Sequence, residues 1–444
     1  MGSGLVDDFE PEIEDHLVAF LDYWRGQDDA VELVINGDLL DFVQAPPYKG
    51  SSLRAADRDG IPLCFTQDQS CDKLEAINSS HCKSFAALGS FLAHRPTNCI
   101  TILPGNHDAD FYWGRVQEKF RALVCGSNDG AAQRLRFWLD PVYRPELCPT
   151  LWIEHGHQHD QVNCFFIGGE PCWSAKNPPI RTDRLGNERL YECIGTRFLI
   201  QYLNDLDMKY PYVDNVKPFS RFLQLFGASA LRPGFGPIHA AVAVASMHAF
   251  LAKTLVTHPK DVLKRDGGEP VSAASLVRAA FEKTSVSRQN AFIDAVRGRG
   301  YPLNISPKIT LANENSAAAL LSFLSDNLDL LDGIDSGPAE GTLKLGQAFR
   351  VDETNELRSH ALRTVSDPNT GARFVIMGHT HEVVNEPSYI NTGSWTRYYK
   401  LQAKERLRPW TVLRTKSWNE FPYQLNFALA KQGGDSLVEL QTYK

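Results

Sequence analysis

The chain has 444 residues, of which 43% are hydrophobic and 22% are charged. This length and composition predict a globular protein of about two or three domains with enough apolar residues for a large core. The net charge of -7 argues against a general binder of nucleic acids or other polyanions, although it leaves room for a local basic pocket.

Cysteine usage and the N-terminal residues predict a cytoplasmic protein. The nine cysteines are odd in number, and no two of them form a Cys-x-x-Cys pair, which indicates reduced thiols rather than disulfides or a zinc knuckle. The first residues do not have the pattern of a signal peptide. The most apolar helical stretch, residues 240–256, carries His248 and Lys253 and is too short and too interrupted to predict a membrane span.

Apolar residues recur at helical spacing over residues 11–24, which predicts an amphipathic helix. An apolar strand is predicted at residues 31–36, followed by a helix-rich stretch at 71–94 and a second strand at 99–103. Further strands are predicted at residues 151–154 and 375–377.

Each of these four strands ends in polar residues of metal-ligand type. They are followed by Gly37-Asp38-Leu39-Leu40-Asp41, Pro104-Gly105-Asn106-His107-Asp108, His155-Gly156-His157-Gln158-His159-Asp160 and Gly378-His379-Thr380-His381. The dipeptides Gly-Asp, Gly-Asn and Gly-His in these endings are also common in ordinary turns. In layered α/β folds, however, sites form at the carboxyl ends of strands. Four endings of this kind in one chain favour a metal site, since histidine is the commonest nitrogen ligand.

The middle of the chain has a different pattern. Helical periodicity without clear strand alternation predicts a helical insertion over the mouth of the site, with helices at residues 189–206, 218–226, 238–256, 273–283, 288–297 and 317–331. Short strands are predicted near residues 410–414, 423–428 and 436–442. The predicted division is a core in two parts, residues 1–160 and 372–444, separated by the insertion at residues 161–371.

The order Gly-Asp-x-x-Asp, Gly-Asn-His-Asp, His-Gly and Gly-His-x-His resembles the calcineurin-like metallophosphoesterase superfamily. The resemblance covers both ends of the chain and leaves out the middle. It implies an α/β (α+β) fold, a four-layer αββα sandwich of two mixed sheets, with a dinuclear metal site. The large helical insertion would interrupt this fold.

The resemblance also implies a role for each matching residue. Asp38 would bridge both metals, while Asn106, His155 and His379 would bind the second metal and His381 the first. His107 would be the catalytic histidine that binds no metal. Asp41, Asp108 and His157 are candidates for supporting a ligand or contacting substrate. His159 is a weaker candidate of the same kind. The histidines interpreted as surface or capping residues are His81, His94, His239, His248, His258 and His360.

The chain departs from the family in one motif. The Asp-x-His that supplies two ligands to the first metal is absent, and Met1-Gly2 fits the position just after it. Asp15-His16 is no substitute, because the two residues are adjacent and lie in a predicted helix. We therefore expect that the chain starts just downstream of the motif and that the first metal site is incomplete here. A zinc-type site usually needs three or four protein ligands.

The ligand set and the resemblance together predict a metal-dependent phosphoesterase. Asp, Asn and His ligands suit Mn, Fe, Zn or Ni better than Mg or Ca. Two such divalent ions would activate a hydroxide to hydrolyse a phosphomonoester, phosphodiester or pyrophosphate bond. The expected substrate is a phosphorylated small molecule, a nucleotide or a lipid-linked compound. The alternative is a catalytically impaired binding or scaffold protein on the same fold, because the first metal motif is absent.

Overall fold

The structure is a computed structural model of the chain. It describes residues 1–3, 7–45, 65–160, 163–167, 170–182, 186–191, 193, 195–196, 215–217, 286–303, 310, 319–320, 323, 353–400, 418–432 and 438–444. The chain divides into two compact units. The first contains Met1–Tyr212, Glu353–Tyr398 and Phe421–Lys444, and the second contains Val213–Asp352 and Tyr399–Glu420. These bounds differ from the predicted division at residues 160 and 371, which stays a prediction.

The first unit contains most of the described elements. Its helices are α1 (Pro11–Arg25), α3 (Gln67–Ser80), α4 (Cys82–His94), α5 (Gly114–Cys125), α6 (Asp129–Arg134) and α15 (Glu353–Ser366), with short 3₁₀ helices η1 (Phe42–Gln44), η2 (Ala109–Tyr112) and η3 (His157–His159). Its strands are β1 (Glu32–Asn36), β2 (Cys99–Leu103), β3 (Leu135–Phe137), β4 (Leu151–Ile153), β5 (Phe166–Ile167), β6 (Glu170–Pro171), β7 (Ile180–Thr182), β8 (Glu188–Leu190), β10 (Phe374–Met377), β11 (Val384–Glu386), β12 (Tyr389–Asn391), β14 (Asn426–Ala430) and β15 (Val438–Thr442).

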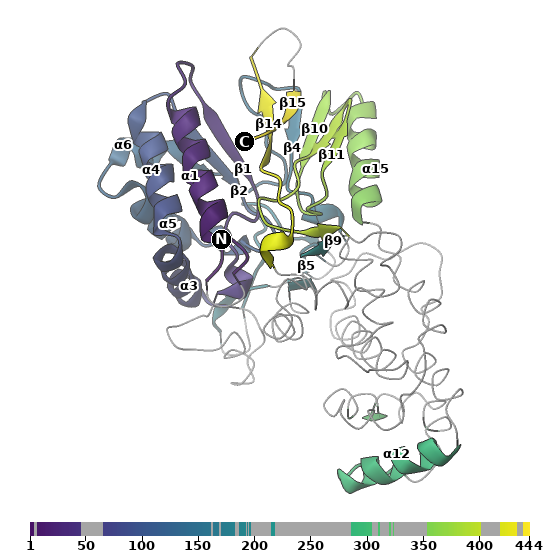
Figure 1. The fold of residues 1–444 in the computed structure, drawn as a ribbon. Coiled ribbons are helices and arrows are strands. Elements are labelled where there is room, and N and C mark those ends of the chain that lie inside the picture. The colour runs from purple at the N-terminus through teal and green to yellow at the C-terminus, as the bar shows by residue number, and fades with distance from the viewer. Residues whose placement is uncertain are drawn as a thin grey trace. The chain divides into compact units, whose positions relative to one another are not determined.

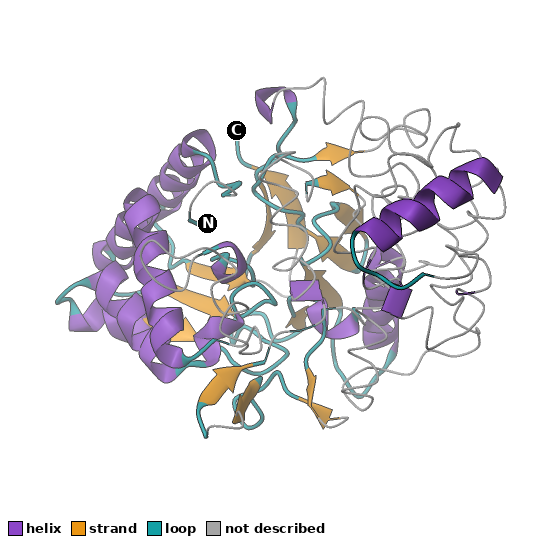
Figure 2. Ribbon diagram, turned by 90° about the horizontal axis from the view of Figure 1, so that it is seen from below, coloured by secondary structure: helices purple, strands orange, loops and turns teal. Residues whose placement is uncertain are grey.

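A parallel sheet of order β1-β2-β3 is covered by the N-terminal helices. Figure 1 and Figure 2 show these helices gathered on one side of the strands. Leu33 and Ile35 of β1 and Ile100 and Ile102 of β2 pack in one apolar core with residues of α1, α4 and α5. The period-two alternation of each strand thus directs one face of the sheet toward the helices.

Helix α1 confirms the amphipathic helix predicted at residues 11–24. Pro11 lies at the start, where its missing N–H costs nothing, and Glu12 in the first turn complements the helix dipole. Ile13 and Phe20 are buried, so the predicted apolar face is the one that packs on the core.

A second sheet has the order β11-β12-β10-β4, in which β10 is parallel to both β12 and β4. The two faces of β10 pack against different partners. Val375 and Met377 contact a cluster with Leu357 of α15, whereas Ile376 packs in a cluster with Leu103 of β2. Because successive side chains of a strand point to opposite faces, β10 is buried on both sides.

A separate apolar cluster joins residues of both sheets. Leu103 of β2, Ile153 of β4 and Ile376 of β10 share it, and Ala428 and Val438 of the antiparallel hairpin β14–β15 pack against it. The first unit is therefore an α+β structure of several small sheets with helices packed on them. The sheets bring the carboxyl ends of β1, β2, β4 and β10 to the same part of the unit.

The middle of the chain contains strands that the sequence did not predict. The antiparallel pairs β5–β6 and β7–β8 lie at residues 166–190. Arg189 and Leu190 belong to β8, so the predicted helix at residues 189–206 was wrong at its start. Strands of two or three residues are too short to show the alternation by which strands are recognised in a sequence.

The second unit contains α12 (Val286–Gly298), the parallel pair β9 (Val216–Lys217) and β13 (Tyr399–Lys400), and η8 (Trp418–Glu420). Helix α12 confirms the helix predicted at residues 288–297. The predicted elements at residues 218–226, 238–256, 273–283 and 410–414, and most of 317–331, lie outside the described residues. Within the described part of the chain, no helix has the length and apolar character needed to cross a membrane.

Candidate metal centre

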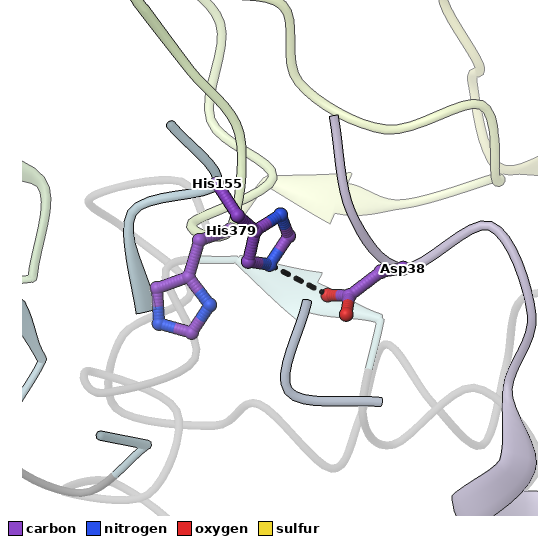
Figure 3. A group of neighbouring side chains, drawn as sticks. All are labelled: Asp38, His155 and His379. Atoms are coloured by element: carbon purple, nitrogen blue, oxygen red, sulfur yellow. Dashed lines mark ion pairs between the residues drawn. The ribbon is translucent and has the colours of Figure 1, made fainter. Parts of the chain in front are cut away.

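Three predicted ligands from distant parts of the chain meet at the carboxyl ends of their strands. Asp38 follows β1, His155 follows β4 and His379 follows β10, and one ligand atom of each lies within 4.8 Å of the others. The Asp38 carboxylate faces the His155 ring, with Oδ2 3.0 Å from Nε2 and His379 beside them (Figure 3). These three side chains could hold a metal ion.

Backbone strain is concentrated in the turns that carry the predicted ligands. Among the described residues, Asp38, His379 and His381 are the non-glycine residues with positive φ, at 53°, 66° and 57°. A left-handed conformation costs an ordinary residue about 1–3 kcal/mol and tends to occur at functional sites. All three strained residues are predicted metal ligands.

Two glycines let the backbone pass against the ligand side chains. A Cβ on Gly37 would lie 2.1 Å from Nδ1 of His155, and a Cβ on Gly105 would lie 2.1 Å from Oδ1 of Asp38. Gly37 also has a φ of 82°, which other residues rarely adopt. The sequence therefore needs glycine at both positions if Asp38 and His155 are to approach each other.

We expect Gly37→Ala to lower the free energy of unfolding by about 1–3 kcal/mol more than Gly186→Ala does. Gly186 is a matched control, because its φ of 86° is nearly the same as that of Gly37 but a Cβ there would meet no atom within 4 Å. The difference between the two variants isolates the clash with His155 from the cost of the left-handed backbone. Urea unfolding of both variants measures it, and equal losses would contradict the close packing at Gly37.

The ring of His155 is oriented by a backbone carbonyl. Its Nδ1 donates to the carbonyl oxygen of Asn36 at 2.7 Å, so that Nε2 faces the centre. A second hydrogen bond of this kind fixes the tautomer of most metal-binding histidines. Burial acts to lower the pKa of His155, but the neighbouring Asp38 carboxylate outweighs it and raises that pKa.

A buried carboxylate orients the ring of His379. Nε2 of His379 lies 2.9 Å from Oδ2 of Asp160, which is fully buried. Asn163 donates to the same oxygen from Nδ2 at 2.6 Å. With Nε2 engaged, Nδ1 is the nitrogen left to accept a metal. The sequence analysis assigned no partner to His379, because Asp160 lies 219 residues away along the chain.

Two buried polar side chains near the centre have ring or amide atoms without a hydrogen bond. Oδ1 of Asn106 and both ring nitrogens of His157 lack a partner among the described residues, and these side chains are 5% and 1% exposed. A buried polar atom left unpaired costs about 1–3 kcal/mol. A ligand bound at the centre would offset that cost, so both residues fit a site that holds an ion and its bound oxygens.

His107 lies beside the cluster and is held by two carboxylates. Its backbone N–H donates to Oδ1 of Asp38 at 2.9 Å, and its Nδ1 lies 3.4 Å from Oδ2 of Asp41. Burial acts to lower the pKa of His107, but Asp41 and Asp38 outweigh it and raise that pKa to about 9. Asp41 itself accepts from the backbone N–H of Gln44 at 3.1 Å, which fixes its position at the start of η1.

Asp108 joins the loops that follow β1 and β2. Its carboxylate is fully buried and accepts backbone N–H groups from Gly105 at 2.6 Å, Asp38 at 3.2 Å and Leu39 at 2.8 Å. Burial and the Asp38 carboxylate raise the pKa of Asp108 to about 7, while these N–H donors favour its ionised form. Asp108 therefore holds the backbone of Asp38 in place.

The His379 turn is held by the next strand. Asn391, fully buried at the end of β12, donates from Nδ2 to the carbonyl oxygen of Gly378 at 2.6 Å and to Oγ1 of Thr380 at 3.1 Å. The sequence analysis gave Asn391 no role, although its position at a strand end was the available signal. His381 lies on this turn but outside the group of ligand atoms formed by Asp38, His155 and His379.

Comparison with known proteins found no protein-family model that matches the chain, and it found no matching curated protein or solved structure.

Proposed function

We propose that the chain is a metal-dependent phosphoesterase that hydrolyses a phosphomonoester, phosphodiester or pyrophosphate bond. The observation that carries the proposal is the meeting of Asp38, His155 and His379 within 4.8 Å, with Asn106 and His107 on a neighbouring loop. The two-sheet packing supports it as well. Helices cover the outer face of each sheet and an apolar cluster joins the sheets, as expected of a four-layer αββα sandwich.

The donor set fits divalent transition metals. One carboxylate, one amide oxygen and two imidazoles match Mn, Fe, Zn or Ni, whereas Mg and Ca prefer oxygen ligands alone. Asp38 would be shared between two ions, and Asn106, His155 and His379 would complete the coordination of one of them. When bound, such ions withdraw charge from phosphoryl oxygens and lower the pKa of water in the site.

The remaining residues would orient the ligand rings and supply a proton to the leaving group. Hydrolysis adds water across a P–O bond, so the leaving oxygen must gain a proton as its bond to phosphorus breaks. His107 would supply that proton. Two contacts support this role, since its backbone N–H donates to the Asp38 carboxylate and its ring is paired with Asp41. Asp160 and the Asn36 carbonyl keep the rings of His379 and His155 in the orientation that exposes one nitrogen of each.

We expect the full chain to release nitrophenol from mono- or bis-nitrophenyl phosphate when Mn²⁺ is supplied, and to stop when a chelator removes it. On phenyl phosphate, whose phenolate is a poor leaving group that needs a proton, His107→Gln should lower kcat by about 10²–10⁴-fold, the usual size of a general-acid contribution. The effect on the nitrophenyl esters should be smaller, because nitrophenolate leaves as the anion. Steady-state kinetics with each substrate measure both effects. The matched control is His94→Gln, an exposed histidine at the end of α4.

Unchanged hydrolysis of phenyl phosphate by His107→Gln would contradict the role of His107 as the proton donor. A folded protein that binds metal but hydrolyses neither substrate class, nor a pyrophosphate, would instead favour a non-catalytic binding protein.

A further inference from the structure

A second group of ligand-type side chains lies near the first centre but on the other face of β4. It consists of Glu154, His159 and His360, whose ligand atoms lie within 4.8 Å of one another. Ile153 packs in the cluster between the sheets, whereas Trp152 packs with Leu357 of α15. Alternation along the strand therefore directs Glu154 toward α15 and His155 toward Asp38.

The carboxylate of Glu154 is the buried member of the group. Its side chain is 3% exposed, with Oε2 3.1 Å from Nε2 of His159 and Oε1 3.2 Å from Nε2 of His360. Oε1 has no hydrogen bond of good geometry among the described residues. Nε2 of His360 is instead engaged with Oγ1 of Thr364 at 3.2 Å. A buried carboxylate is costly unless a cation neutralises it. The two imidazoles do so only when they are protonated, whereas a bound metal ion would do so with both imidazoles neutral.

The two imidazoles come from different elements and leave the group open to solvent. His159 ends η3 and His360 lies in α15, and their side chains are 22% and 25% exposed. An ion can therefore reach the group from one side, and a water can occupy the remaining position. The rings are stacked with centroids 3.4 Å apart. Coordination of one ion by both nitrogens requires the rings to spread, and their partial exposure leaves room for that movement.

We propose that Glu154, His159 and His360 form a separate binding site for a divalent ion of the zinc type. Two imidazoles and one carboxylate are a common three-residue zinc set, in which water fills the fourth position. The ion would neutralise the buried Glu154 carboxylate and link η3 to α15. The proposal does not depend on phosphoesterase activity, because it concerns other residues on the opposite face of the strand.

The test is a zinc titration of the metal-free full chain against a chromophoric chelator, comparing the native protein with His360→Gln, Asp38→Asn and His94→Gln. We expect His360→Gln to lose one equivalent of tight zinc that Asp38→Asn retains, and His94→Gln to lose none. With Co²⁺ in place of Zn²⁺, His360→Gln should also lose the visible absorption of that equivalent. His159→Gln is a second variant with the same expected loss, for use if His360→Gln does not fold.

Two results would overturn the proposal. One is an equal zinc stoichiometry and affinity in the native protein and in both the His360→Gln and His159→Gln variants. The other is the loss of all tight zinc in Asp38→Asn, which would mean that the only tight ions bind at the first centre.

Discussion

Asp38→Asn is expected to lower metal-dependent hydrolysis by about 10³-fold or more, equivalent to about 4 kcal/mol of transition-state stabilisation. The substitution removes the negative charge that lies 3.0 Å from Nε2 of His155 and that would be shared between the bound ions. An asparagine oxygen can still accept the N–H of His107, which now donates to Asp38 at 2.9 Å. We therefore expect the fold to survive while metal binding at this centre and activity are lost.

Activity, metal content and circular dichroism of Asp38→Asn should be measured together. The control is Asp22→Asn, which removes a carboxylate from the exposed surface of α1, where Asp22 pairs with Arg25. A folded Asp38→Asn that keeps the native metal content and turnover would show that the three-residue group is not the catalytic metal centre.

Asp108→Asn is expected to lower the free energy of unfolding by about 2–4 kcal/mol. The Asp108 carboxylate accepts N–H groups from Gly105 and Asp38 at one oxygen and from Leu39 at the other. An amide nitrogen in place of either oxygen would face N–H donors and leave at least one of them buried without an acceptor. Asp38 should also lose its position, so activity should fall together with stability.

Urea unfolding with a check on the m-value measures the stability of Asp108→Asn. Asp129→Asn, an exposed aspartate in the first turn of α6, removes the same charge without touching the two loops. A cost as small as that of Asp129→Asn would mean that the loops after β1 and β2 hold their conformation without Asp108.

Much of the first unit could be predicted because its signals are local. The strand at residues 99–103 matches β2, and the helix at 11–24 matches α1 to within a residue. In both elements, apolar residues recur at the spacing of the secondary structure along the whole length. The short strands β5 to β8 were missed because two or three residues define no period, and they depend instead on pairing with a neighbour.

The candidate centre was predictable as a set of strand endings, whereas its supporting residues were not. Asp38, His155 and His379 each follow a strand whose carboxyl end could be found from the sequence. The contact of Asp160 with His379 and the hydrogen bonds from Asn391 to the His379 turn depend on sheet order, which no local pattern contains. His360 was interpreted as a surface or capping residue, because its helical position gives no sign that it meets Glu154.

The left-handed backbone at Asp38, His379 and His381 limits which substitutions could stabilise this protein. Glycine would relieve the strain at each position, and each replacement would remove a side chain of ligand type. Selection for thermal stability alone would favour glycine at these three positions, whereas selection for the proposed metal site would oppose it. The stability that glycine could add at these three positions is therefore out of reach while the protein keeps these side chains.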